Sequence, residues 1–295
     1  MRYSAKFVKG LFKVLNMKKI VGISMIDPPK RRNIIAKQLK RIDIPQKVQS
    51  LDGHQLITLL PAHPTKRHVF YLHGGGYALE ASPFHKNLQE RFVKRYNLKV
   101  SYFDYPLAPE NTAEKTLPLT EKAFRHLNFL YPDDKFYLFG DSAGGGLAMS
   151  LAQLLRDIDL EQRPEKIALV SPWLDATVSD PRSNELQEKD VLLEKDLLTE
   201  AGENYAGTWA VTDPRVSPIY GNFDDLGRLF VIAGTDEILY PDVLRLQERI
   251  KRSENTEMTL TVVPDMMHDF VVYPLKESLT YIDQIGEFFS EKQEK

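Results

Sequence analysis

Apolar and polar positions alternate with two different periods along most of this chain. From about residue 51 onward, short runs of apolar, β-branched and aromatic residues take turns with longer stretches whose apolar residues recur every three or four positions. The first pattern is typical of buried strands and the second of amphipathic helices. This alternation predicts an α/β fold in which helices flank a mostly parallel central sheet.

The apolar runs predict seven strands, at His54–Leu60, His68–Leu72, Lys99–Phe103, Phe136–Phe139, Lys166–Val170, Leu229–Ala233 and Met258–Val263. Helical periodicity covers about residues 84–96, 112–130, 145–157, 240–252 and 275–290. Residues 183–212 are rich in leucine and charged residues and carry no strand pattern, so we interpret them as a helical insertion. Residues 51–295 are therefore predicted to form one α/β domain that contains this insertion.

The first 50 residues differ from the rest in charge. They contain 13 Lys or Arg and two acidic residues, whereas the whole chain has a formal net charge of -2. Within residues 1–15 the apolar side chains cover about half of a helix circumference, and the lysines gather opposite them. We interpret residues 1–50 as a basic N-terminal helical segment. Residues 1–15 either pack their apolar face on the body of the protein or lie on an anionic membrane as a peripheral contact.

Composition narrows the class of protein further. The chain of 295 residues has no cysteine, which excludes disulfides and thiol catalysis and fits a reducing compartment. No apolar run near the N-terminus has the length of a signal peptide or membrane span, so the expected location is the cytoplasm. The sequence pI near 6.4 argues against nucleic acid as a partner. Whether the chain forms a homodimer is left open.

The first candidate site lies between a predicted strand and a predicted helix, at Gly140–Gly144. Its sequence Gly-Asp-Ser-Ala-Gly places Ser142 at a sharp turn, where larger residues two positions away would collide with the neighbouring strand and helix. A helix that begins there also directs unpaired N–H groups at the reacting atoms. Ser142 is thus a candidate nucleophile.

A second motif, His73-Gly-Gly-Gly-Tyr77, directly follows the strand at His68–Leu72. Consecutive glycines expose backbone N–H groups that can bind an oxyanion. Phosphate binding is disfavoured because the chain lacks the glycine patterns of nucleotide-binding loops.

A serine nucleophile needs a histidine base, and the histidine needs an acid on its other ring nitrogen. Asp236 and His268 each follow a predicted strand, and only His268 among the seven histidines comes after both Ser142 and the acid. Asp236 is the predicted acid because it lies nearest the strand end. Four other acidic residues compete with it: Glu237, Asp242, Asp265 and Asp269.

No metal or cofactor is predicted. The sequence has no His-Glu-x-x-His motif, and its histidines do not pair at metal-ligand spacing near acids.

Together these motifs resemble the hormone-sensitive-lipase-like branch of the α/β-hydrolases, over roughly residues 55–292. The matching segments begin at His73, Asp104, Gly140, Ser171, Asp213, Gly234 and His268. The resemblance implies a catalytic triad of Ser142, Asp236 and His268, and an oxyanion hole formed by the N–H groups of Gly75, Gly76 and Ala143. It also implies a cap over the site, made by residues 1–50 and about 183–212.

The sequence therefore predicts a serine carboxylic-ester hydrolase that acts on small-molecule, short- to medium-chain acyl esters through an acyl-enzyme. An amidase, an acyltransferase or a lipid-ester lipase would use the same triad. A ligand-binding homologue without activity is disfavoured because all three triad residue types are present.

Overall fold

The computed structural model describes residues 2–30 and 43–291. In this part of the chain, eight strands form one sheet in the order β1-β2-β4-β3-β5-β6-β7-β8. The six strands β4, β3, β5, β6, β7 and β8 run parallel to one another. Strand β2 pairs antiparallel with both β1 and β4. The predicted α/β fold is confirmed. The strands are β1 (Gln46–Leu51), β2 (His54–Leu59), β3 (Arg67–Leu72), β4 (Lys99–Phe103), β5 (Lys135–Asp141), β6 (Lys166–Val170), β7 (Gly227–Asp236) and β8 (Thr256–Met267).

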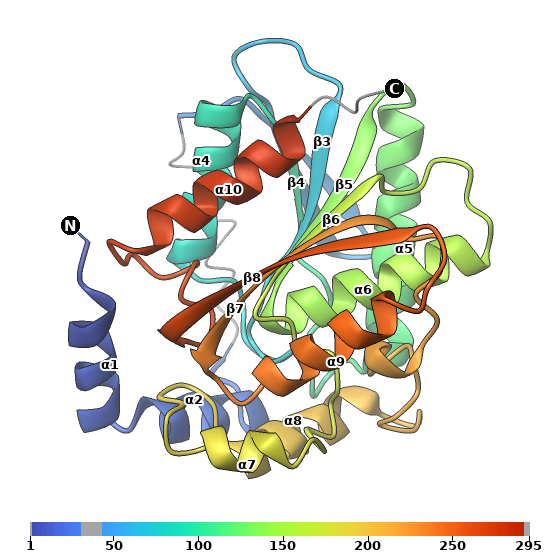
Figure 1. Ribbon diagram of the computed structural model, residues 1–295. Helices are drawn as coiled ribbons and strands as arrows, with labels where there is room; N and C mark the ends of the chain where they lie inside the picture. The colour runs from blue at the N-terminus through green and yellow to red at the C-terminus, as the bar shows by residue number, and fades with distance from the viewer. Residues whose placement is uncertain (1, 31–42, 292–295) are drawn as a thin grey trace.

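Helices cover both faces of the sheet (Figure 1). On one face, α4 (Pro83–Tyr96) packs against α10 (Ser278–Ser290); on the other lie α5 (Ala113–Leu130), α6 (Ser142–Asp157) and α9 (Tyr240–Ile250). The central strands β3, β4 and β6 are almost entirely buried, as expected for a parallel sheet with helices on both sides.

The sheet begins earlier in the chain than the sequence indicates. Strand β1 starts at Gln46, so the boundary placed at residue 50 cuts through a strand. The apolar pattern does not reveal β1, because it is an edge strand with mostly polar side chains exposed to solvent. Residues 292–295, assigned to the α/β domain, lie outside the described residues.

Two N-terminal helices and the insertion lie beyond the carboxyl ends of the parallel strands (Figure 1). They are α1 (Ala5–Val14), α2 (Met17–Ile26), α7 (Arg182–Leu186) and α8 (Lys195–Ala206). Helix α2 packs closely on α8: a Cβ atom at Gly22 would lie 2.4 Å from Cδ1 of Leu197. The insertion is helical over two short stretches and not throughout 183–212. Residues 31–42 of the predicted basic segment lie outside the described residues. Among the described residues, no helix has the length and apolar character needed to cross a membrane.

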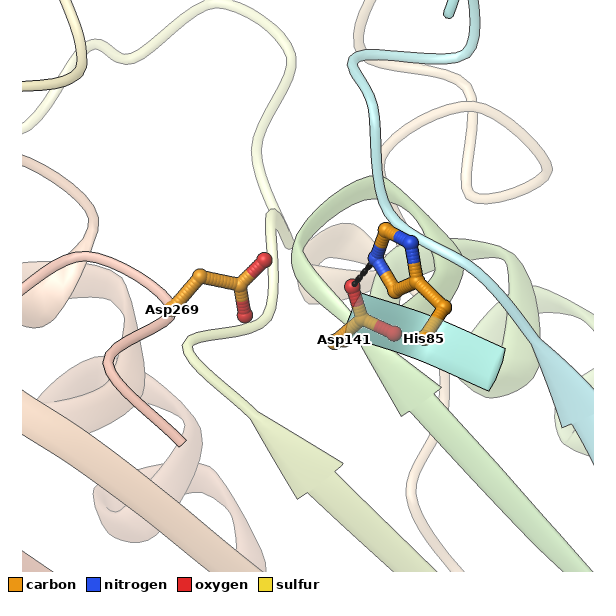
Figure 2. A group of neighbouring side chains, drawn as sticks. All are labelled: His85, Asp141 and Asp269. Carbon is orange, nitrogen blue, oxygen red and sulfur yellow. Dashed lines mark hydrogen bonds and ion pairs between the residues drawn. The ribbon is translucent and has the colours of Figure 1, made fainter. Parts of the chain in front are cut away.

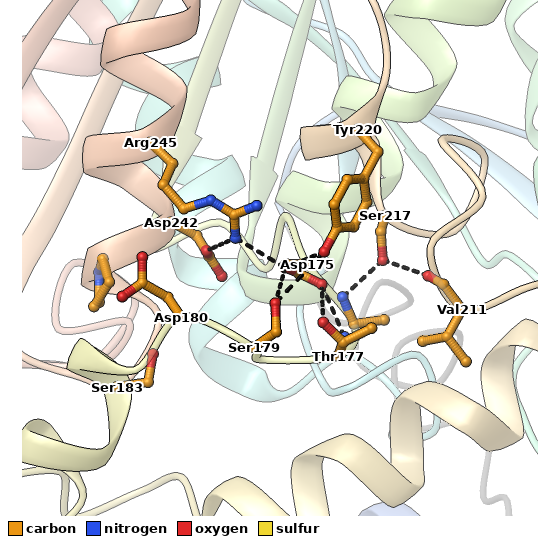
Figure 3. Close-up of polar contacts among 12 residues, drawn as sticks. Asp175, Thr177, Ser179, Asp180, Ser183, Val211, Ser217, Tyr220, Asp242 and Arg245 are labelled. Atoms are coloured by element: carbon orange, nitrogen blue, oxygen red, sulfur yellow. Dashed lines mark hydrogen bonds and ion pairs between the residues drawn. The ribbon is translucent and has the colours of Figure 1, made fainter.

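A buried polar network fixes the loop that follows β6 (Figure 3). The carboxylate of Asp175 accepts hydrogen bonds from Thr177, Ser179 and Tyr220, and its Oδ2 lies 2.9 Å from Nη1 of Arg245. The full burial of this charge is tolerated because each oxygen has donors. The network holds the loop whose Trp173 N–H donates to the carbonyl of Ser142 at 2.9 Å.

One guanidinium in this network serves two buried carboxylates. Nη1 of Arg245 also donates to Oδ1 of Asp242 at 2.7 Å. Burial, together with the nearby carboxylate of Asp175, raises the pKa of Asp242 to about 7 in spite of this contact. Because the ordinary value is 3.8, the folded protein binds more protons at this residue than the unfolded chain does between about pH 4 and pH 7. The free energy of unfolding therefore decreases as the pH rises through that range, because the folded protein must ionise a buried Asp242.

The substitution Asp242→Asn should remove this loss while leaving an oxygen to accept from Arg245. As the pH rises from 5 to 8, we expect the melting temperature of the variant to increase relative to that of the wild type, because asparagine does not ionise. A difference of one pKa unit corresponds to about 1.4 kcal/mol of stability. Circular dichroism melts across this range measure the difference.

Asp283→Asn provides the control. Although burial acts to raise its pKa, hydrogen bonding to Arg91 holds the pKa of Asp283 below the ordinary value. Because the pKa of Asp283 is lowered, its stabilising contribution is fully present above about pH 5. The loss of melting temperature caused by Asp283→Asn should therefore not change between pH 5 and pH 8. A constant melting difference for Asp242→Asn would contradict the assignment.

Candidate active site

The turn between β5 and α6 holds Ser142 in a left-handed backbone conformation, with a φ of 50°. The surrounding backbone is close enough to require glycine: a Cβ at Gly140 would lie 2.3 Å from the carbonyl oxygen of Gly144, and one at Gly144 would lie 2.1 Å from that of Leu72. The prediction that a larger residue would collide with its surroundings at both positions is therefore confirmed. The helix begins at Ser142 itself, three residues earlier than predicted, because glycines 144–146 allow α6 to approach neighbouring segments instead of breaking it.

His268 lies directly after β8 and contacts the serine. Its Nε2 is 2.9 Å from Oγ of Ser142, and its Nδ1 is 2.6 Å from Oε2 of Glu237. A carboxylate accepts hydrogen bonds, so Nδ1 carries the proton and Nε2 of the neutral ring is free to accept from the serine hydroxyl. All three side chains are buried. The structure thus brings together a hydroxyl, an imidazole and a carboxylate in one hydrogen-bonded chain.

The expectation that Asp236 orients His268 is not met. The carboxylate of Asp236 instead forms an ion pair with Lys9 of α1, whose ammonium group also donates to the carbonyl of Asp265 at 2.8 Å. Successive side chains point to opposite sides of an extended chain, so of two neighbouring acids at a strand end only one faces the histidine. The sequence placed both acids at the end of β7, and the pairing irregularity between β7 and β8 at this point decides which one turns inward.

Glu237 has the environment that a buried carboxylate needs. Its Oε1 accepts from Oγ of Ser171 at 2.9 Å and from the backbone N–H of Gly234 at 2.8 Å, which leaves Oε2 for His268. The insertion supports the same segment, since the buried carboxylate of Asp190 accepts from the N–H of Ile238 at 2.9 Å. The supporting roles of Ser171 and Asp190 were not predicted. Ser171 opens one of the matching motif segments, but that match assigned it no role, and Asp190 lies in no motif.

The glycine loop after β3 lies beside the serine. Gly75 and Gly76 have φ values of 121° and 61°, which side-chain-bearing residues rarely adopt. Gly75 lines the same cavity as Ser142, whereas Gly76 lies beneath α2, where a Cβ would come within 2.5 Å of Sδ of Met25. Ala143 is the second residue of α6 and is buried. Within residues 2–30 and 43–291, no hydrogen bond occupies the N–H groups of these three predicted oxyanion donors.

Asp141 fixes the glycine loop against the serine turn. Its carboxylate accepts from the hydroxyl of Tyr71 at 2.6 Å, from the N–H of Gly74 at 2.8 Å and from Nε2 of His85 at 3.1 Å. The N–H of Ser82 donates to Nδ1 of His85, so the ring proton lies on Nε2 and faces Asp141. Burial acts to raise the pKa of Asp141, but the His85 imidazole and these hydrogen bonds hold it below the ordinary value. Asp141 is an ionised brace for the loop.

A third buried residue completes this group, which Figure 2 shows. Ligand atoms of His85, Asp141 and Asp269 lie within 4.8 Å of one another, as metal ligands could. The arrangement does not suit a metal ion, because Nε2 of His85 directs its proton at Asp141 and both Asp141 oxygens already accept hydrogen bonds. Burial and the neighbouring carboxylate of Asp141 raise the pKa of Asp269 well above its ordinary value. The raised pKa favours the protonated form of Asp269 beside the carboxylate of Asp141.

The cavity above Ser142 has a volume of about 190 Å³ and a mostly apolar lining. Helix α2 contributes Val21 and Met25, and the insertion contributes Leu192 and Leu193. Helix α2 and the insertion therefore both border the cavity that contains the reacting group. A space with this lining can accept an apolar chain.

This arrangement can perform acyl transfer. The imidazole can accept the serine proton while the carboxylate stabilises the resulting cation.

Comparison with known proteins gives the same assignment. A family profile for the α/β-hydrolase fold matches residues 69–272. An acetyl-hydrolase of Streptomyces hygroscopicus is 30% identical over 234 residues, which are 77% of this chain and 77% of that protein. The esterase LipU of Mycobacterium tuberculosis is 27% identical over 79% of this chain and 80% of its own.

Solved structures extend the likeness to the whole molecule. A hormone-sensitive lipase from a metagenome library has a TM-score of 0.81 and 26% identity, and the match covers 98% of each chain. An esterase of the bacterial hormone-sensitive lipase family has a TM-score of 0.78 and 26% identity, covering 93% of this chain and 97% of its own. The resemblance drawn from the motifs is confirmed: the chain belongs to the α/β-hydrolase family, and its structural neighbours are esterases of the hormone-sensitive lipase group.

Proposed function

We propose that this protein is a serine carboxylic-ester hydrolase whose triad is Ser142, His268 and Glu237. The observation that carries the proposal is the continuous hydrogen-bonded chain from Oγ of Ser142 through both ring nitrogens of His268 to Oε2 of Glu237. In this reading Glu237 replaces Asp236 as the triad acid.

The reaction follows from this geometry. The Ser142 hydroxyl attacks the ester carbonyl while Nε2 of His268 accepts its proton, and the same nitrogen returns that proton to the leaving alcohol. The Glu237 carboxylate holds the Nδ1–H tautomer and stabilises the imidazolium. Water then attacks the carbonyl of the acyl-enzyme while Nε2 of His268 accepts its proton. The same nitrogen returns that proton to Oγ of Ser142 as the carboxylic acid leaves.

The negative charge of the tetrahedral intermediate would be bound by the N–H groups of Gly75, Gly76 and Ala143. The last of these belongs to the first turn of α6, where N–H groups have no partner within the helix. Such donors lower the barrier because they are already oriented when the charge develops. The hydrogen bonds of Asp141 to the loop maintain that orientation.

The cap of this proposed enzyme consists of α2 and of the segment that carries α7 and α8. Both contribute apolar side chains to the cavity above Ser142, and α2 packs on α8. A cavity of about 190 Å³ favours esters with short or medium acyl chains. Location in the cytoplasm stays a prediction from the cysteine-free composition.

Replacement of the nucleophile tests the reaction class. Ser142→Ala should abolish hydrolysis of a short-chain nitrophenyl ester while the protein stays folded, because no other group can form the acyl-enzyme. Wild-type enzyme mixed with a slowly deacylated ester should gain the acyl mass on the peptide containing Ser142, as measured by mass spectrometry. Full activity in the folded variant would contradict the mechanism. Parallel assays with an anilide and with an added alcohol distinguish esterase from amidase and acyltransferase.

A pair of isosteric substitutions identifies the triad acid. Glu237→Gln should lower kcat by about 10³- to 10⁴-fold, since an amide cannot hold the required tautomer or balance the imidazolium charge. Asp236→Asn removes the charge of the residue that precedes Glu237. It should change kcat by less than about tenfold, because the carboxylate of Asp236 contacts Lys9 and not His268. Steady-state kinetics of both variants against the same ester measure the difference. The reverse order of effects would restore Asp236 as the acid.

A further inference from the structure

Large apolar side chains are exposed in one region of the molecule more than elsewhere. Among the described residues, eleven such side chains are exposed, and seven of these lie between Tyr3 and Ile23. Single exposed apolar residues are common on protein surfaces, whereas a concentration of them in one part of the chain indicates a candidate site of interaction. We call these seven residues the apolar face: Tyr3, Phe7, Leu11, Val14, Leu15, Ile20 and Ile23.

The apolar face is held outward by contacts on the other side of α1. Ala5 and Val8 are buried, Lys9 pairs with Asp236, and the backbone of Tyr3 bonds to Pro274 and Lys276. Of the two alternatives for this helix, packing of the whole apolar side on the body is thus not what the structure shows. Phe7 and Val14 remain 59% and 83% exposed although α1 is anchored.

The charge around this face indicates its partner. Residues 1–26 contain six Lys or Arg and no acidic residue. Lys9 is paired with Asp236, whereas Lys6, Lys13 and Lys19 are exposed beside the apolar face. Apolar side chains flanked by cations match a lipid surface with anionic headgroups.

Other occupants match less well. A second copy that used the same face would bring two cationic surfaces together. Residues 31–42 carry five Lys or Arg and no acid, so they are not complementary in charge either.

The apolar face lies next to the catalytic cavity. A groove of about 640 Å³ runs beneath α1, and its walls include Phe84 and Tyr273, which also line the cavity that contains Ser142. Helix α2 carries Ile20 and Ile23 outward and places Val21 and Met25 in the cavity wall. Figure 1 shows α1 and α2 together at the outside of the fold. A molecule bound at the apolar face therefore lies close to the cavity that contains Ser142.

We propose that the apolar face binds anionic lipid surfaces and presents acyl esters dissolved in them to Ser142. The lipid-binding part stands on the surface alone, while the delivery of esters rests on the proposed hydrolase function. Binding inserts the apolar side chains among the acyl chains, and the exposed lysines contact the headgroups.

The test compares vesicles of phosphatidylcholine with vesicles that contain one third phosphatidylglycerol, using cosedimentation of the full chain. The variant Val14→Ser/Leu15→Ser/Ile20→Ser changes residues that line neither cavity and should bind at least tenfold more weakly to the anionic vesicles. Lys6→Gln/Lys13→Gln/Lys19→Gln should lose about 100-fold in binding at low salt. Phe129→Ser, on α5 and 80% exposed, is the matched control and should bind like wild type.

Soluble-ester activity separates this proposal from the proposed function. All variants should hydrolyse a soluble short-chain ester at the wild-type rate without vesicles, and unchanged melting temperatures confirm folding. If wild type binds vesicles but hydrolyses no ester, the hydrolase function fails and the lipid surface stands. Equal binding of wild type and the serine variant, or no binding by wild type, overturns the proposal. A dimer that the serine substitutions dissociate, without vesicle binding, would assign the face to a second copy.

Discussion

The close approach of backbone segments around Ser142 is the constraint on which the rest of the site depends. The left-handed conformation of this residue is unfavourable for a side chain with a Cβ, and contacts of Gly140 and Gly144 with surrounding backbone hold it in place. Because the turn is fixed from several sides, the hydroxyl lies where His268 reaches it and the first N–H groups of α6 lie beside it. The buried sheet supplies the rigidity that this strain requires.

Buried carboxylates connect that turn to the loops around it. Asp141 ties the glycine loop to the serine turn, Asp175 fixes the loop that follows β6, and Asp190 supports the segment carrying Glu237. Each accepts hydrogen bonds from several donors, at least one of them from a distant part of the chain, which makes its position specific. The loops at the carboxyl ends of the strands are thereby held as one unit, although they are far apart in sequence.

The N-terminal helices both contact this unit and face the surroundings of the protein. Lys9 joins α1 to the residue next to the proposed triad acid, and α2 forms part of the cavity wall through Val21 and Met25. The same helices expose the apolar face to the surroundings. In the proposed ester hydrolase, the apolar face and the cavity that contains Ser142 therefore lie on opposite sides of one layer of helices.

Sequence alone determined the α/β alternation, the serine turn, the glycine loop and His268, because each of these depends on local periodicity or on glycine at positions where a Cβ would collide. It could not determine which of two adjacent acids meets the histidine. Asp236 and Glu237 follow the same strand, and the choice depends on the strand pairing between β7 and β8 and on donors from Ser171 and Gly234. Edge strand β1 and the outward direction of the apolar face were also decided only by tertiary structure, since exposure depends on which neighbours cover a residue. Local conformation is encoded in neighbouring residues, whereas the partners of a buried charge come from the whole fold.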